Sequence, residues 1–209
     1  MNDVLIIIGG GSSIGNFNFH LLDDYTTFGL NFVYQLYKPT VILWVDKEFY
    51  NNNKLSINNC DSLKITKICD NLPKNIIQLP TSKKYIEEDC FSLGVYDQFL
   101  VGLFSLTIGI ELGFKNIFLL GYDGKFINNK SHFHNIEHRG KYNEKGYLRG
   151  NLMFDVYKNC KSKIFNVSIN SAINTFEKIT YENFIDLLKS FKTINQNEIK
   201  KIILNKIIS

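Results

Sequence analysis

Short runs of apolar, β-favouring residues recur along the chain, and longer segments with helical spacing separate them. Period-2 alternation and short apolar runs predict strands over residues 4–8, 40–45, 76–79, 116–120 and 163–167, with a weaker one over 26–30. Apolar residues at helical spacing predict helices over residues 31–36, 96–112, 146–158, 181–191 and 196–208. Polar residues fill the segments 51–56 and 124–143, which we expect to be loops.

This alternation of strands and helices predicts the fold class. Strands that alternate with helices form a mainly parallel sheet with helices on both faces. The continuous apolar runs "VLIII" and "NIFLLG" agree, because central parallel strands are buried on both sides. No repeat and no Pro/Gly/Ser-rich linker divides the 209 residues. We therefore expect one Rossmann-like α/β domain over residues 1–209, with a C-terminal helix at about 196–208.

Composition excludes several classes of protein. The net charge of +4 is mild, and the lysines gather in the tail "NQNEIKKIILNKIIS", which favours a solvated helix face over a nucleic-acid interface. The four cysteines form no CxxC pair, which is typical of reduced thiols in a cytoplasmic protein and not of structural zinc. No signal peptide is visible, and no stretch reaches about 18 apolar residues. We expect a soluble cytoplasmic protein whose tail could pack on its own domain or on a second subunit through Ile199, Ile202, Ile203 and Ile207.

The first predicted strand runs directly into a glycine-rich loop. Gly9, Gly10 and Gly11 precede Ser12 and Ser13 at the carboxyl end of that strand, where doubly wound folds bind their ligands. The spacing fits neither the GxGxxG fingerprint nor the GxxxxGK[ST] motif. The loop is either a plain tight turn or a cradle of N–H and O–H donors for a phosphate, and we favour the cradle.

The helix predicted over residues 96–112 is apolar on nearly every face. It is therefore a buried crossover, and small residues at Gly102, Ser105 and Gly109 allow close approach along one side. Its first turn, with Val101 and Gly102, could present free amides to a ligand. The next strand delivers Asp123 to the carboxyl edge of the sheet.

The long loop after that strand holds three of the four histidines. His132, His134 and His138 lie there, together with Arg139 and Tyr142. Histidine carries protons near neutral pH, so we expect one of the three to act as a general base, although a solvated polar loop is the plainer alternative. The His-x-His spacing also suits a metal, but so few acids lie nearby that we predict no metal site.

Among these histidines we choose His134 first. Phe133 beside it can anchor the loop on the core and fix the direction of the imidazole. The fourth histidine, His20, is expected to be structural or exposed. After the strand 163–167, Ser168, Asn170 and Ser171 could hydrogen-bond a base or ribose, or could cap a turn.

Several of these segments together resemble two related families. The segments are "IIIGGGSS", "GLN", "GLFSLTIGIELGFKNIFLLGYD" and "NSAINTF". In this order they resemble the bacterial CMP-sialic-acid-dependent sialyltransferases of the small Rossmann-like type, and equally the 6-hydroxymethyl-dihydropterin diphosphokinase-like domains. The helix–strand–Gly-x-Asp unit is the most specific part of the resemblance.

The resemblance to the sialyltransferases implies roles for particular residues. The cytidine nucleotide would bind at the glycine loop Gly9–Gly11, at Asn31 and at the helix start Val101–Gly102. A histidine beyond the Gly-x-Asp strand would be the general base, and tyrosines would hold the phosphate. The chain departs from the pattern, since Gly10 stands where the family has asparagine and Val101 where it has serine.

Three functions remain open at this point. The first is a glycosyltransferase that moves a sugar from a nucleotide donor, with CMP-sugar favoured, to a hydroxyl acceptor, and that needs no tightly bound cofactor. The second is a diphosphokinase of the pterin type, which would require Mg²⁺ and for which Asp46 and Asp123 are the candidate ligands. The third is a protein that binds a nucleotide without turnover.

Overall fold

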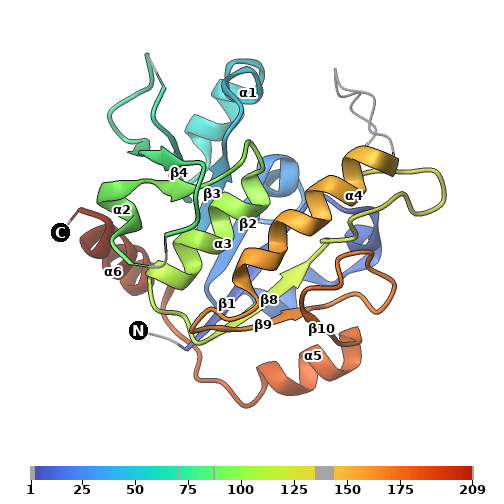
Figure 1. Ribbon diagram of the computed structural model, residues 1–209. Coiled ribbons are helices and arrows are strands. Elements are labelled where there is room, and N and C mark those ends of the chain that lie inside the picture. Colours follow the sequence, from blue (N-terminus) through green and yellow to red (C-terminus); the bar gives the residue numbers. More distant parts are fainter. Residues whose placement is uncertain (1–2, 70, 87, 135–143, 209) are drawn as a thin grey trace.

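Eight parallel strands form the centre of the molecule in the order β10-β9-β8-β1-β2-β3-β4-β5 (Figure 1). The computed structural model describes residues 3–69, 71–86, 88–134 and 144–208. The strands are β1 (Val4–Ile8), β2 (Thr27–Leu30), β3 (Val41–Trp44), β4 (Leu63–Lys67), β5 (Ile77–Leu79), β8 (Asn116–Leu120), β9 (Lys163–Asn166) and β10 (Glu177–Lys178). A small second sheet pairs β6 (Thr81–Ser82) with β7 (Val95–Tyr96).

Helices cover both faces of this sheet. They are α1 (Lys47–Asn59), α2 (Cys90–Leu93), α3 (Val101–Glu111), α4 (Glu144–Leu152), α5 (Tyr181–Leu188) and α6 (Gln196–Ile208). Short 3-10 helices are η1 (Ser12–Asn16), η2 (Phe19–Leu22), η3 (Asn31–Gln35) and η4 (Met153–Tyr157). Within the described ranges, no helix is long and apolar enough to cross a membrane.

The strand order reverses between β1 and β8. From β1 the chain builds the sheet outward through β2, β3, β4 and β5, whereas β8, β9 and β10 extend it on the other side. In open α/β sheets, ligands bind in the crevice outside the carboxyl ends of the strands at such a switch point. The register pairs Ile8 with Leu120, so the segments that follow β1 and β8 begin side by side.

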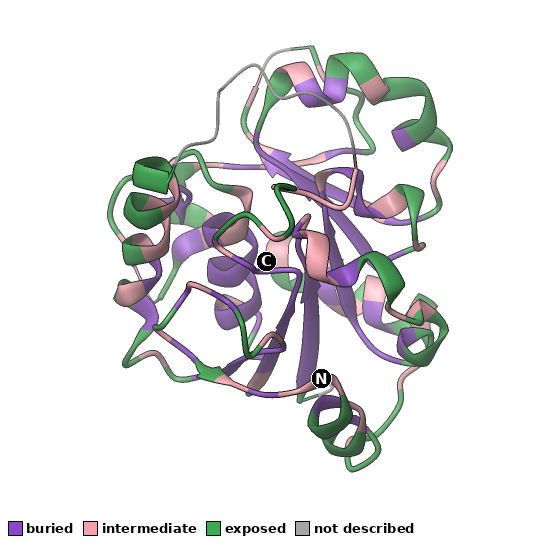
Figure 2. Ribbon diagram, turned by 90° about the vertical axis from the view of Figure 1, so that its right-hand side faces the viewer, coloured by how far each residue is buried: buried purple, intermediate pink, exposed green. Residues whose placement is uncertain are grey.

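The core lies on both faces of the sheet, as the apolar runs predict. Along β1, Leu5 and Ile7 pack into the cluster that contains α3, while Ile6 and Ile8 pack into the cluster with Phe184 of α5. Figure 2 shows the central strands as buried and the outer faces of the helices as exposed. The Rossmann-like α/β fold with helices on both faces is confirmed.

The small-residue face of α3 has the predicted packing role. A Cβ added at Gly109 would lie 2.6 Å from Cδ2 of Leu5, so glycine lets the helix approach the central strand closely. The helix begins later than predicted, at Val101, because Val95 and Tyr96 pair with β6 as a strand.

Several elements were not predicted from the sequence, among them helices α1 and α2 and the strands β4, β6, β7 and β10. Residues 51–56, predicted as a polar loop, lie inside α1, which Asp46 caps by accepting a hydrogen bond from the Glu48 N–H at 2.8 Å. The helix buries only Phe49, Tyr50 and Ile57, so its asparagine-rich exposed face hid the helical pattern. Strand β4 was also missed, and the segment predicted as a helix over 31–36 is the 3-10 helix η3.

Candidate functional site

A cavity of about 250 Å³ opens at the switch point of the sheet. Six segments that are distant in sequence form its walls: the loops after β1, β2, β8 and β9, the start of α3, and one side of α4 with η4. Its polar and backbone lining includes Gly9, Gly10, Gly11, Asn31, Val101, Gly102, Asp123, Lys125, His132, His134 and Asn151. Its apolar lining includes Leu30, Phe32, Leu100, Tyr122, Phe154 and Ile173.

The glycine loop lies in backbone contact with the segment after β8. The N–H of Gly9 donates to the carbonyl of Leu120 at 2.7 Å, and the N–H of Gly11 donates to that of Gly121 at 2.9 Å. A Cβ would lie 2.8 Å from the Gly121 oxygen if added at Gly9, and 2.5 Å from it if added at Gly11. Glycine is therefore needed here first for the contact between the two loops. Among the described residues, none accepts a hydrogen bond from the N–H of Gly10 or Ser12.

A buried carboxylate fixes the end of this loop. Asp123, which is 2% exposed, accepts a hydrogen bond from the Ser13 N–H at 3.0 Å and one from its hydroxyl at 2.5 Å. Both bonds hold the start of η1, so the carboxylate acts as a cap for that short helix. Asp123 lines the cavity, but its carboxylate oxygens are engaged by the glycine loop.

Replacing Asp123 with alanine should lower the free energy of unfolding by about 2–4 kcal/mol, because two charge-assisted hydrogen bonds are lost in a buried place. Urea unfolding followed by circular dichroism measures this loss. Asp186→Ala is the matched control: that carboxylate is exposed and pairs with Lys189, so we expect a change below about 1 kcal/mol. Equal stability of the two variants would contradict the bracing role.

Asn31 turns the chain sharply at the end of β2. Its φ of 48° lies in the left-handed region, which asparagine tolerates better than most residues. The turn places Asn31 in the cavity wall, and its side chain makes no hydrogen bond to any residue that the structure describes. The amide is available to a ligand, in a position where the backbone is strained.

The first turn of α3 faces the same cavity with open amides. Leu100 precedes the helix and offers no side-chain cap, and within the described residues nothing accepts from the N–H of Val101 or Gly102. These donors and the helix dipole favour an anion. Tyr122 forms the floor below, since Cβ atoms added at Gly9 and Gly102 would lie 3.0 and 3.2 Å from its ring. Burial raises the pKa of Tyr122 well above its usual range, so the phenol stays neutral and bonds Ser105 at 3.2 Å.

Two of the loop histidines lie over the glycine loop. The ring of His132 contacts Gly10, where an added Cβ would lie 2.9 Å from its Cδ2 atom. His134 stacks on His132 with ring centroids 5.1 Å apart and meets the edge of Phe32 at 4.5 Å. The Phe133 N–H donates to the Gly10 carbonyl at 3.0 Å, and its ring packs against two core clusters. The predicted anchoring by Phe133 is therefore confirmed.

Comparison with solved structures finds a likeness to two sialyltransferase structures. One is the sialyltransferase CST-II in complex with a trisaccharide acceptor and CMP, at 16% identity and a TM-score of 0.49, over 92% of this chain and 91% of that one. The other is the sialyltransferase CstII from Campylobacter jejuni in complex with cytidine-5'-monophosphate, at 19% identity and a TM-score of 0.49, over 86% and 85% of the two chains. No protein-family model matches the chain, and no curated protein matches it. The likeness concerns the arrangement of strands and helices only.

Most of the predicted site residues meet in the cavity, and others do not. Ser12, Ser13, Ser168, Asn170 and Ser171 do not line it. The hydroxyl of Ser171 is buried and donates to the Tyr122 carbonyl at 2.7 Å, so it fixes the turn after β8. His138 and Tyr142 fall outside the described residues, and His20 is exposed, with its side chain 90% accessible.

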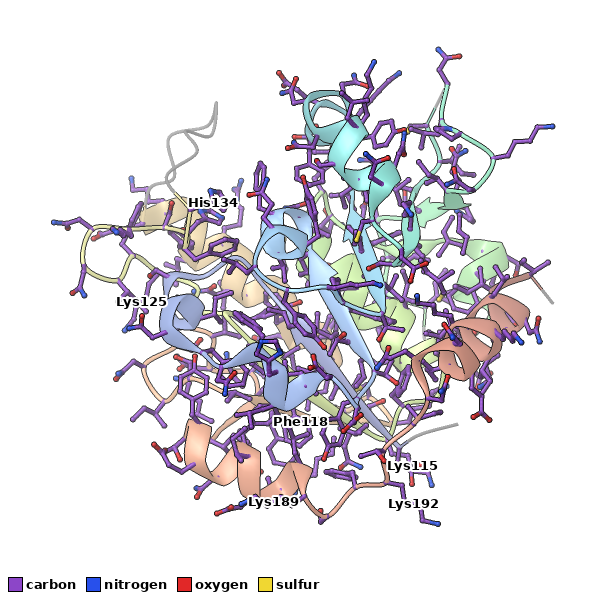
Figure 3. All side chains as sticks on the ribbon, turned by 180° about the vertical axis from the view of Figure 1, so that it is seen from behind. Lys115, Phe118, Lys125, His134, Lys189 and Lys192 are labelled. Atoms are coloured by element: carbon purple, nitrogen blue, oxygen red, sulfur yellow. The ribbon has the colours of Figure 1, made fainter. Side chains whose placement is uncertain are left out.

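Three further residues line the cavity that were not predicted as part of the site: Lys125, Gly146 and Gly150. Lys125 lies two residues beyond Asp123 and lines the cavity, and Figure 3 shows it on the same side of the molecule as His134. Gly146 and Gly150, four residues apart on α4, also line the cavity. Their spacing places both on one side of the helix and was visible in the sequence, but the polar composition of α4 gave no reason to expect a ligand there.

Proposed function

We propose that this protein is a transferase that uses a nucleotide-activated donor, specifically a glycosyltransferase with a CMP-sugar donor and a hydroxyl acceptor. One observation carries the proposal: the glycine loop, the open first turn of α3 and two histidines line a single cavity at the switch point of the sheet. Anion donors and a proton acceptor thus lie within one small volume.

Each part of the cavity has a role in this reaction. The donor phosphate binds the amides of Gly10, Val101 and Gly102, where the helix dipole stabilises the charge that grows on the leaving group. Asn31 hydrogen-bonds the base or ribose. A neutral His134 takes the proton from the acceptor hydroxyl as the hydroxyl attacks the sugar. Holding both reactants in one cavity supplies further acceleration.

Calorimetry with a panel of nucleotides and nucleotide sugars tests the proposal. We expect CMP and CMP-sugars to bind with dissociation constants between about 1 µM and 1 mM, a range typical of enzyme substrates, and the UDP- and GDP-sugars to bind more weakly. If none of them binds and ATP does, the glycosyltransferase proposal is wrong.

Lys125 supplies a cation for the phosphate. Lys125→Gln should weaken CMP binding by about 10- to 100-fold while leaving cytidine binding unchanged, since one charge-assisted bond is worth roughly 1.5–3 kcal/mol. Lys130→Gln is the control, because Lys130 lies on the same loop but does not line the cavity. Calorimetry with CMP and with cytidine on each variant gives both affinities. An equal loss for nucleotide and nucleoside would show that Lys125 does not contact the phosphate.

The structure does not favour the diphosphokinase alternative. Its two candidate magnesium ligands both make structural hydrogen bonds, Asp123 to the glycine loop and Asp46 to the first turn of α1. The non-catalytic alternative predicts nucleotide binding without turnover, and transfer of sugar from CMP-sugar to an acceptor separates it from the proposed enzyme.

A further inference from the structure

Two lysines, an aspartate and a phenylalanine form a cluster beside the cavity. Lys67 ends β4, Lys83 follows β6, and Asp97 and Phe99 lie between β7 and α3. The Lys83 Nζ atom is 3.1 Å from Oδ1 of Asp97, and the Lys67 Nζ atom is 4.0 Å from Oδ2. The aspartate side chain is 1% exposed, while that of Lys83 is 52% exposed. The buried carboxylate therefore holds the two ammonium groups on its solvent side, and the side chain of Lys83 is half exposed.

Phe99 is held at the surface by a strained turn. Its φ is 66° and that of Gln98 is 39°, so two successive residues other than glycine adopt the left-handed conformation. Asp97 accepts a hydrogen bond from the Phe99 N–H at 3.3 Å, and the Gln98 amide donates to the Lys83 carbonyl at 2.6 Å. The result is a phenylalanine that is 69% exposed. Backbone strain and an exposed aromatic ring both oppose folding, and this combination is typical of binding sites.

Both ammonium groups lie against this ring. The Nζ atom of Lys83 is 3.4 Å from the ring centroid of Phe99, and that of Lys67 is 5.3 Å from it. The two cations face one carboxylate, so the cluster keeps one positive charge next to an exposed apolar surface. Such a combination binds an anionic group that is attached to a ring or another apolar body.

The cluster lies at the same edge of the sheet as the cavity. Leu100 directly follows Phe99 and lines the cavity, and consecutive Cα atoms are only about 3.8 Å apart. Lys67 ends β4, which lies two strands from β2 in the sheet, or about 10 Å at the usual strand spacing. One or two sugar rings span a distance of this size, so a substrate at the β2 side of the cavity can extend toward the two lysines.

We infer that Lys67, Lys83 and Phe99 form a subsite for a negatively charged group of the acceptor substrate, with Asp97 as the residue that positions both lysines. The inference rests on the proposed function, which assigns the cavity itself to the donor. A carboxylate and a phosphate share the chemistry that the subsite recognises, so the acceptor is a sugar acid or a sugar phosphate.

Titrations with three matched sugars test this subsite. Glucose, glucuronate and glucose 6-phosphate are titrated separately at low ionic strength, followed by ligand-observed NMR, with saturating CMP present. We expect glucuronate or glucose 6-phosphate to bind at least tenfold more tightly than glucose, and the tighter of the two identifies the anion. In the double variant K67Q/K83Q this preference should vanish. Lys115→Gln is the control and should keep it, because Lys115 pairs with Asp3 far from His134 (Figure 3).

The double variant leaves Asp97 buried without its cations, so a triple variant K67Q/K83Q/D97N removes that charge as well and should also lose the preference. Equal affinity of the wild-type protein for glucose and both anions overturns the inference, as does a preference that survives in a folded variant. Competition between the preferred anion and CMP overturns its assignment to the acceptor. If CMP binds but neither anion is preferred, the subsite inference is wrong and the proposed function still holds. If an anion is preferred but CMP does not bind, the proposed function is wrong and the cluster is an anion site of another kind.

Discussion

Replacing His134 with alanine is expected to lower turnover by about 10²–10⁴-fold, the usual contribution of a general base, with nucleotide affinity almost unchanged. The imidazole lies in the cavity wall, held between His132 and Phe32, and so it has a fixed direction. Removing it takes away the proposed proton acceptor but leaves the amides of the glycine loop and of α3 in place. Steady-state kinetics with CMP-sugar and calorimetry with CMP measure the two effects separately.

The three other histidines make this test specific. His20→Ala should keep full activity, because His20 is exposed and lies outside the cavity. If His134→Ala keeps full activity while His132→Ala or His138→Ala loses it, the general base is the other histidine. If all these variants turn over normally, the histidine mechanism is wrong.

Replacing Gly11 with alanine is expected to lower the free energy of unfolding by about 3 kcal/mol, at the upper end for overpacking. The new methyl group would lie 2.5 Å from the carbonyl oxygen of Gly121 and 2.6 Å from Oδ2 of Asp123. Neither atom can move freely, because one is backbone and the other is bound to Ser13. The loops after β1 and β8 must separate, and CMP affinity should fall with them.

Gly15→Ala is the matched control for this variant. A Cβ at Gly15 meets nothing within 4 Å, although the residue lies only four positions further along the chain. We expect its stability to change by less than about 1 kcal/mol. Urea unfolding of the Gly11→Ala and Gly15→Ala variants measures both changes in stability. Similar unfolding midpoints would show that the glycine loop is not tightly packed.

The sequence predicted the elements whose apolar residues are nearly continuous. Strands β1 and β8 and helix α3 are buried on all sides, and such runs need no knowledge of their neighbours to be recognised. Helix α1 was missed because only Phe49, Tyr50 and Ile57 are buried and asparagines fill the rest. A half-exposed helix whose residues have low helix propensity is stabilised by tertiary contacts, and the pattern of apolar residues does not reveal those contacts.

The site was predicted in part for a similar reason. The carboxyl ends of parallel strands meet at one edge, so Gly9 and Asp123 could be placed together from the strand pattern, and the family resemblance added Asn31. The side chains that face the ligand could not be predicted, because their orientation depends on contacts between loops that are distant in sequence. Asp123 turns to Ser13, and Ser171 turns to the Tyr122 carbonyl. The helix that contains α4 was predicted, but its place in the cavity wall and that of Lys125 were not, because only the folded chain brings them to the cavity.

The pairing of β1 with β8 also determines when the cavity can form. Val4 pairs with Asn116, and the strands between them in sequence build outward on the far side of β1. During synthesis, β1 therefore leaves the ribosome long before β8 has been made. Until then, one edge of this wholly apolar strand has no strand to pair with. Contacts between such distant segments slow folding and expose the chain to aggregation. Because both β1 and β8 contribute loops to the cavity, the proposed nucleotide ligand can bind only after this late step, and its presence should favour the completed chain over aggregates.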